Sequence, residues 1–195
     1  MNDSIDIKVY KEKGEDIQLF EQIALGSKRA LEHFYVKYYK YLSRFAASYE
    51  SDSYLVEEKI SDVFLYLWEN RETLLEINSP KVYVFTMLKN MLFQHKKKLK
   101  TKAISFDYAV FQDKYYSENI EEQIILNEQE HQLQKDLLLI INKIPAGSRR
   151  IFEMNRVDGL RYRQIAEILN ISVRTVENHM SIALRTINKI LIQRK

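Results

Sequence analysis

The chain has 195 residues and a formal net charge of +3, and it holds only four glycines and two prolines. An average chain carries about 12% of these two residues together, and tight β-turns depend on them for their backbone conformations. So few turn residues exclude a fold rich in β-hairpins and predict an all-α protein. The absence of cysteine excludes disulfides and thiolate metal sites.

The sequence carries no signal for export or membrane insertion. Its first eight residues are polar and of mixed charge, without the apolar segment of a signal peptide. No run approaches the roughly eighteen consecutive apolar residues that are needed to span a bilayer. We therefore expect a cytoplasmic protein without membrane insertion.

A glycine-serine break separates the first two expected helices. Periodic apolar residues predict a short helix near 16–25 and a long helix from 27 to about 49. Gly26 ends the first helix, and Ser27 is expected to cap the second through its hydroxyl. The tyrosines of the long helix are three and four residues apart, so most should lie in the core with their hydroxyls at the surface.

Two further helices complete the first half of the chain. After the polar run 50–53, Ser53 is expected to cap a third helix that continues through Trp68. A proline suits the first turn of a helix, so a fourth helix is expected from Pro80 to about Lys98.

A segment without periodicity divides the chain. Residues 99–119 are expected to form a linker between an N-terminal domain at 10–98 and a C-terminal domain at 120–195. The second domain should begin with a helix over 120–144 that ends before Pro145, which a helix interior does not accept. The sequence thus predicts two small helical bundles joined by a linker.

Three short helices are expected at the C-terminal end, over 148–157, 161–169 and 173–192. The last two are joined by a three-residue turn in which Asn170 can adopt the left-handed conformation. Ser172 is placed to cap the final helix. This pattern predicts a helix-turn-helix whose recognition helix begins at residue 173.

The outward-facing residues of this motif suit duplex DNA. Arginine bonds bidentately to guanine and asparagine to adenine, and a recognition helix reads bases with its first turns. Phosphate contacts fix the register without reading the sequence. The expected base-reading residues are Arg174, Thr175, Asn178 and Arg185, with Ser172, Arg161 and Arg163 placed for phosphates. The alternative is an ordinary helical hairpin with a solvated basic face.

The charge distribution agrees with a nucleic-acid partner for the C-terminal part of the chain. From Arg149 to the end there are ten basic and four acidic residues, whereas 103–136 contains eight acidic and two basic ones. A basic end behind an acidic connector is typical of a chain that meets nucleic acid with one part only.

Three segments resemble extracytoplasmic-function sigma factors of the sigma-70 family. VEEKISDVFLYLWENRE at 56–72 resembles their polymerase-binding helix, and PKVYVFTMLKNMLFQHKKK at 80–98 resembles the helix that engages the melted promoter. IPAGSRRIFEMNRVDGLRYRQIAEILNISVRTVENH at 144–179 resembles their domain for the upstream (−35) promoter element. The resemblance implies a factor that directs core RNA polymerase to specific promoters and assists DNA melting.

The resemblance also implies residue roles. The expected polymerase-binding residues are Glu57, Glu58, Ser61, Asp62 and Leu65, although the family usually has an apolar residue where Lys59 stands and a glutamine where Ser61 stands. The residues expected at the melted element are Asn78, Ser79, Lys81, Lys89, Asn90, Lys96, Lys97 and Lys98, and the first three of these should line a pocket for an extruded base. Without the family, the lysines would be read as solvated and Phe85 and Phe93 as core.

No enzymatic or metal-binding constellation is visible. The four histidines, His33, His95, His131 and His179, are isolated at any metal-binding spacing, and there is no phosphate loop or nucleophile motif. We therefore expect neither catalysis nor a cofactor.

The expected partners are core RNA polymerase and promoter DNA, and the resemblance adds a cognate anti-sigma factor that can cover these surfaces. Two alternatives stay open. One is a LuxR-type regulator that binds duplex DNA without acting as a polymerase subunit, and the other is a helical interaction protein whose basic patches only solubilise it.

Overall fold

The computed structural model describes residues 14–102 and 137–193, with side chains over 14–95 and 137–192. Every regular element in these ranges is a helix, and no strand occurs within them. The expected all-α fold class is therefore confirmed. None of the helices in these ranges is long and apolar enough to cross a membrane.

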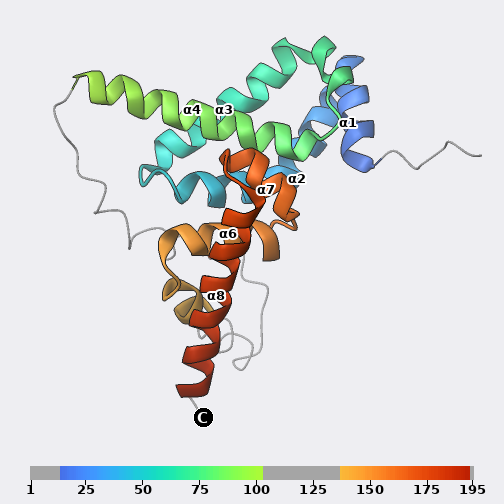
Figure 1. The fold of residues 1–195 in the computed structure, drawn as a ribbon. Helices are drawn as coiled ribbons and strands as arrows, with labels where there is room; N and C mark the ends of the chain where they lie inside the picture. Colours follow the sequence, from blue (N-terminus) through green and yellow to red (C-terminus); the bar gives the residue numbers. More distant parts are fainter. Residues whose placement is uncertain (1–13, 103–136, 194–195) are drawn as a thin grey trace, which may run out of the picture.

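The N-terminal helices pack into a bundle around α2 (Figure 1). In chain order they are α1 Glu15–Ala24, α2 Lys28–Ala47, α3 Ser53–Glu69, the short 3-10 helix η1 Arg71–Glu76, and α4 Pro80–Lys102. The far end of α4 projects beyond the bundle (Figure 1).

The C-terminal helices lie against one side of this bundle. Residues 137–142 are helical and are followed by α6 Ala146–Arg156, α7 Tyr162–Leu169 and α8 Val173–Gln193. The short helix α7 contacts α4, whereas the second half of α8 extends away from the N-terminal helices (Figure 1).

The caps follow the sequence at α2 but not at α3. The hydroxyl of Ser27 accepts a hydrogen bond from the Ala30 amide at 3.2 Å, as expected. At α3 the cap is Asp52 rather than Ser53, and its carboxylate accepts from the amides of Tyr54 and Leu55 at 3.0 and 3.4 Å. A carboxylate carries a full negative charge toward the positive end of the helix dipole, which a hydroxyl does not supply.

Two helix boundaries differ from the sequence-based expectation, and one element was not expected. α4 continues to Lys102 instead of ending near Lys98, so the start of the expected linker is helical. α6 begins at Ala146 rather than Ser148, with Pro145 as its N-cap. Proline interrupts a helix interior but is tolerated at its start. The unexpected element is η1, which follows directly on α3 and which no pattern in the sequence analysis predicted. The rest of the expected linker, 103–119, and the residues 120–136 of the expected fifth helix lie outside the described residues.

One hydrophobic cluster extends through both groups of helices. In the N-terminal bundle the ring of Phe85 is completely buried and stands edge-on to Phe45 at 5.1 Å between centroids. The same cluster continues into Ile165 and Ile168 of α7, both fully buried. Phe85 is thus a core residue, whereas Phe93 is 44% exposed. The two groups of helices are packed on one another in this structure.

Candidate nucleic-acid interface

The turn between α7 and α8 has the conformation that the sequence predicts. Asn170 adopts left-handed backbone angles, with φ 56° and ψ 50°, and the amide of Ile171 then donates to the Ala166 carbonyl at 3.0 Å. The hydroxyl of Ser172 accepts from the Thr175 amide at 3.0 Å, which makes it the cap of α8. These short-range contacts fix the direction in which the recognition helix leaves the turn.

The recognition helix presents a polar face to solvent. Its inner side is formed by the buried residues Val176, Met180 and Ala183. Its outer side carries the exposed expected contacts Arg174, Asn178 and Arg185, together with the half-buried Thr175, whose hydroxyl lies 2.8 Å from that of Ser172. Arg161 and Arg163, expected at phosphates, are exposed at the start of α7.

The inner stripe of α8 is shorter than its periodicity indicates. Val173, Leu184 and Leu191 continue the three- and four-residue spacing of the buried residues, but they are 37%, 46% and 48% exposed. For the later residues the reason lies in the fold, because α8 continues past the helices on which its first turns pack (Figure 1).

A histidine that the sequence did not single out for this role anchors the recognition helix to α6. Nδ1 of His179 lies 2.9 Å from the hydroxyl of Ser148, a residue of α6 that is 2% exposed. This hydrogen bond holds α8 to α6. The sequence analysis considered the four histidines only as metal ligands. No sequence motif predicted the contact between His179 and Ser148.

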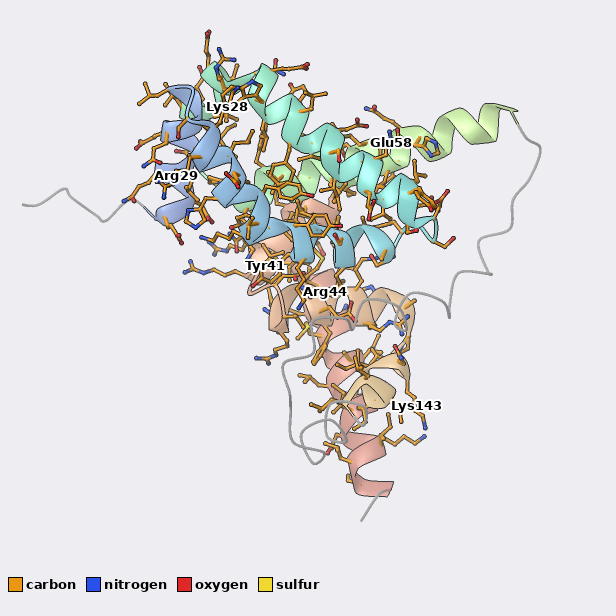
Figure 2. All side chains as sticks on the ribbon, turned by 180° about the vertical axis from the view of Figure 1, so that it is seen from behind. Lys28, Arg29, Tyr41, Arg44, Glu58 and Lys143 are labelled. Carbon is orange, nitrogen blue, oxygen red and sulfur yellow. The ribbon has the colours of Figure 1, made fainter. Side chains whose placement is uncertain are left out.

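The residues expected to bind polymerase share one face of α3. Glu57, Glu58, Ser61 and Leu65 are exposed, and Leu65 retains 56% of its accessible surface. Figure 2 shows Glu58 on the outer side of this helix.

Lys59, where the family usually has an apolar residue, is mostly buried in this face between two carboxylates. Its ammonium lies 2.7 Å from the Glu58 carboxylate and 2.8 Å from that of Asp62, and its side chain is only 13% exposed. Burial opposes the charge, but the hydrogen bonds to Asp62 and Glu58 outweigh it and raise the pKa of Lys59. Lys59 therefore pairs with two of the expected polymerase contacts and offsets one of their two negative charges.

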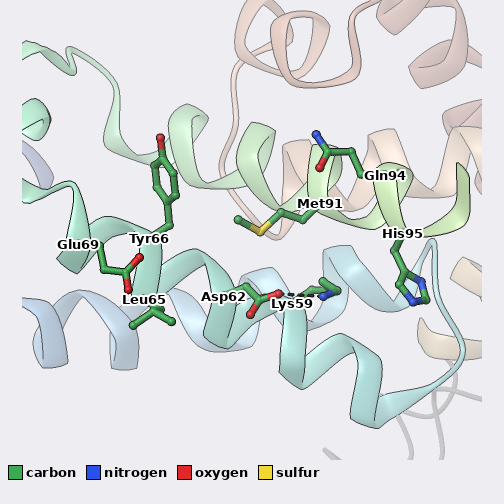
Figure 3. A pocket seen from close by; sticks show the side chains of 8 residues that line it. All are labelled: Lys59, Asp62, Leu65, Tyr66, Glu69, Met91, Gln94 and His95. Atoms are coloured by element: carbon green, nitrogen blue, oxygen red, sulfur yellow. Dashed lines mark hydrogen bonds and ion pairs between the residues drawn. The ribbon is translucent and has the colours of Figure 1, made fainter. Parts of the chain in front are cut away.

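A cavity of about 270 Å³ lies beside these residues, between α3 and α4 (Figure 3). It is lined by Lys59, Asp62, Leu65, Tyr66, Glu69, Met91, Gln94 and His95. Its mixed lining shows no convergent set of catalytic groups. Over the part of the chain that the structure describes, no group of three or more His, Cys, Asp or Glu side chains could hold a metal ion.

The residues expected at the melted element differ in their exposure and in their hydrogen-bond partners. Asn78 and Asn90 are exposed, and Ser79 is half-buried. Lys81 instead donates to the backbone carbonyl of Asp158, and Lys89 donates to that of Ile168 at 2.5 Å. Desolvation by burial lowers the pKa of both lysines. The side chains of Lys96, Lys97 and Lys98 lie outside the described residues.

Polar residues that the sequence did not single out join the two groups of helices. Arg44 of α2 binds the carboxylate of Asp158, which follows α6. Arg150 of α6 donates to the hydroxyl and carbonyl of Ser48 at 2.8 and 2.6 Å. Figure 2 shows Arg44 where α2 meets the C-terminal helices. No local pattern announces these pairs, because each joins residues more than one hundred positions apart.

Two family models match the chain, one in each group of helices. The model described as Sigma-70 region 2 matches residues 34–101, and the model described as Sigma-70, region 4 matches residues 134–187. No curated protein sequence matches the chain at a significant level.

The solved structures that share the fold include those of CnrH and RpoE. CnrH, solved in complex with the cytosolic domain of CnrY, is 17% identical with a TM-score of 0.54, and the match covers 93% of this chain and 99% of that one. The sigma factor RpoE from Bartonella quintana, solved with the anti-sigma factor NepR, is also 17% identical. Its TM-score is 0.53, and the match covers 82% of this chain and 95% of that chain.

The two region models together span more than half of the 195 residues, in the order expected from the sequence. The recognition helix with its exposed polar face lies within the region 4 match, and α3 and α4 lie within the region 2 match. The chain therefore belongs to the sigma-70 family and is an RNA polymerase sigma factor.

Proposed function

We propose that this sigma factor works in the manner of the extracytoplasmic-function group. It binds core RNA polymerase in the cytoplasm, brings it to specific promoters and assists opening of the DNA. The observation that carries the proposal is the first turn and a half of α8. There Arg174 and Asn178 are exposed on a helix that the Asn170 turn, the Ser172 cap and the His179–Ser148 bond hold in place.

The upstream promoter element is read by α8 in the major groove. Arg174 and Asn178 are four residues apart, so they lie on the same side of the helix. Each bidentate pair with a base discriminates by about 1–3 kcal/mol. Arg161 and Arg163 at the start of α7 bind the neighbouring phosphates and set the register.

Core polymerase is held by the exposed face of α3. Leu65 provides the apolar centre, and Glu57, Glu58, Ser61 and Asp62 provide the polar surround. Interfaces of this kind combine a buried apolar centre with a polar rim. The positive charge of Lys59 between Glu58 and Asp62 makes this face less acidic than its carboxylates alone indicate.

DNA melting is shared between this factor and polymerase. Opening about ten base-pair steps costs on the order of 14 kcal/mol, at about 1.4 kcal/mol a step. A few lysines cannot supply this, so polymerase holds the open DNA while this factor captures an extruded base. Asn78, Ser79 and Lys81 precede or begin α4 and line the pocket for that base, while Lys89, Asn90, Lys96, Lys97 and Lys98 follow the strand along α4.

This role requires binding and positioning rather than catalysis by the chain itself, and it needs no cofactor. The solved relative from Bartonella quintana is bound by an anti-sigma factor. We include such a factor among the partners of this chain, as a protein that covers its promoter- and polymerase-binding surfaces.

The test is reconstituted transcription. Core polymerase with the purified chain should give promoter-specific transcripts from a library of upstream sequences, and core polymerase alone should not. A chain that binds duplex DNA tightly and specifically but leaves core polymerase unchanged would instead be a regulator of the LuxR type. A chain that binds neither partner would be an interaction protein.

A further inference from the structure

One carboxylate lies among the residues that α8 presents to solvent. Glu177 is exposed, three positions after Arg174 and one position before Asn178. Residues three and four positions apart are neighbours on the surface of a helix, so Arg174, Glu177 and Ser181 form one row. The carboxylate therefore lies on the part of α8 that the proposed function brings to the major groove.

This carboxylate has no structural partner within the described ranges. No described residue forms an ion pair or a hydrogen bond with its side chain, and this includes the neighbouring Arg174. The hydroxyl of Ser181 donates to the backbone carbonyl of Glu177 at 2.9 Å and leaves the carboxylate oxygens free. Glu177 is thus available to a ligand.

The helix dipole does not account for an acidic residue at this position either. A carboxylate stabilises a helix through the dipole mainly within the first turn. α8 begins at Val173 and has no acidic residue in its first turn, so Glu177 comes only in the second. Its negative charge gains little from the helix that carries it.

Beside duplex DNA a carboxylate has few possible partners. Phosphates repel it, and an ionised carboxylate is only an acceptor, so it cannot bond to guanine N7 and O6 or to thymine O4. The donors that remain in the major groove are the amino groups of cytosine and adenine. Adenine places its N7 acceptor beside the amino group, whereas cytosine presents the donor N4 without a neighbouring acceptor. Cytosine is therefore the base that suits a carboxylate best.

We propose that Glu177 is a base-reading residue and accepts a hydrogen bond from the N4 amino group of a cytosine in the upstream promoter element. The inference rests on the proposed function, because it requires α8 to lie in the major groove. Three helical residues rise about 4.5 Å, close to the spacing of about 3.4 Å between successive base pairs. The cytosine therefore belongs to a base pair next to the one that Arg174 reads.

Glu177 acts by exclusion as well as by attraction. Where another base replaces the cytosine, the carboxylate meets an acceptor or loses its donor, and such unfavourable contacts are a source of specificity. A mismatch at one base pair typically weakens binding by about 5- to 100-fold. We expect a preference of this size for cytosine at one position of the upstream element.

A duplex library with a randomised upstream element tests the assignment. Core polymerase with the unchanged full chain should select cytosine at one position. Glu177→Gln keeps the size of the side chain, but its carboxamide both donates and accepts and so pairs with adenine N6 and N7. This variant should select adenine at the same position. Dissociation constants for two duplexes that differ only at that base pair measure the change.

Glu167→Gln is the matched control, because Glu167 is an exposed glutamate of α7 in the same helix-turn-helix and lies outside the proposed DNA contacts. It removes the same charge and should leave every base preference as it is. Glu177→Ala should lose discrimination at the cytosine position without gaining a preference for adenine. Arg174→Ala should keep the cytosine preference and lose selection at its own, neighbouring position.

Several results would overturn the assignment. A Glu177→Gln chain that keeps the base preferences of the unchanged chain, or that binds every duplex more tightly by the same factor, shows that the carboxylate only repels phosphates. The same conclusion follows if the unchanged chain prefers cytosine nowhere in the upstream element. Helical circular dichroism checks that the variants fold, and Glu177→Ala decides the question if Glu177→Gln does not.

The assignment and the proposed function fail in different ways, because the selection is repeated with the chain alone. Promoter-specific transcription with the same base preference in Glu177→Gln keeps the function and removes the assignment. A change from cytosine to adenine in duplexes bound by the chain alone, without transcripts from core polymerase, keeps the assignment and removes the function.

Discussion

The guanidinium of Arg44 binds the carboxylate of Asp158, 114 positions later in the chain. Arg44 lies in the last turn of α2 and Asp158 directly after α6, so this ion pair ties the N-terminal bundle to the C-terminal helices. Because the carboxylate is almost wholly buried, removing either partner of the pair is strongly destabilising.

We expect Arg44→Ala and Asp158→Ala each to destabilise the chain, and the double variant to be more stable than the sum of the two losses predicts. Residues in direct contact typically show a coupling of about 0.5–3 kcal/mol. Urea unfolding of the four chains measures it. A coupling of zero would mean that the two side chains do not interact in solution.

Ser172 separates a structural role from a role in DNA binding. Its hydroxyl caps α8, so Ser172→Ala should lower the unfolding free energy by about 1 kcal/mol. Ser172→Asp retains the cap and should restore stability, but its negative charge should weaken binding to the promoter duplex. Thermal unfolding and duplex binding are measured on both variants. Equal duplex binding by Ser172→Asp and the unchanged chain would remove Ser172 from the phosphate contacts.

Arg174 and Arg161 are expected to differ in what they read. Arg174→Ala should weaken promoter binding selectively. The loss in binding free energy should be about 1–3 kcal/mol on promoters with the matching base. Arg161→Ala should weaken all promoters alike and reduce the salt dependence of binding by about one phosphate contact. Binding is measured on a promoter library at several salt concentrations. Uniform loss from Arg174→Ala would reassign it to a phosphate.

Lys59 should limit binding to polymerase. Lys59→Met keeps an aliphatic stem in the cavity beside α3 and releases Glu58 and Asp62 from their ion pairs. If these carboxylates contact a basic surface of core polymerase, the variant should bind more tightly, and the gain should fall as salt is raised. Titration of core polymerase with labelled chains measures it, with Lys40→Met, an exposed residue of α2, as control. Weaker binding would show that Lys59 itself contacts polymerase.

Tyr38 makes the stability of the folded chain depend on pH in the alkaline range. Its hydroxyl donates to the Asp16 carboxylate at 2.5 Å, and burial and then this carboxylate raise the pKa of Tyr38 above its ordinary value. In the unfolded chain the phenol ionises near pH 10, whereas in the folded chain it keeps its proton. This contribution to stability is therefore present below about pH 10 and is lost as the pH rises further.

Tyr38→Phe should lower the unfolding free energy by about 1 kcal/mol near neutral pH, and it should flatten the loss of stability above pH 10. Lys37 lies 2.8 Å from the other oxygen of Asp16, so the carboxylate keeps a partner in the variant. Unfolding curves between pH 7 and about pH 11 check both effects. An unchanged alkaline slope would show that Tyr38 is not the group responsible.

Local signals in the sequence were sufficient for the helix-turn-helix and for most of the described α-helices, but not for η1 or for two helix boundaries. The Ser27 cap, the left-handed Asn170 and the Ser172 cap each depend on residues within a few positions, so spacing and residue type predict them. The same holds for the segments that resemble sigma factors, and the two region models confirmed that resemblance. The choice of Asp52 over Ser53 as a cap was missed because both residues suit that position.

What only the tertiary structure decided is which of these surfaces are free. The sequence could assign Lys81 and Lys89 to DNA, but it could not show that carbonyls of Asp158 and Ile168 occupy them, because those carbonyls lie nearly eighty residues away. Every residue has a backbone carbonyl, so the residue type does not indicate which carbonyl accepts a hydrogen bond from a distant lysine. Periodicity and capping specify how each helix forms, whereas the closure of Arg44 on Asp158 follows from how the finished helices pack.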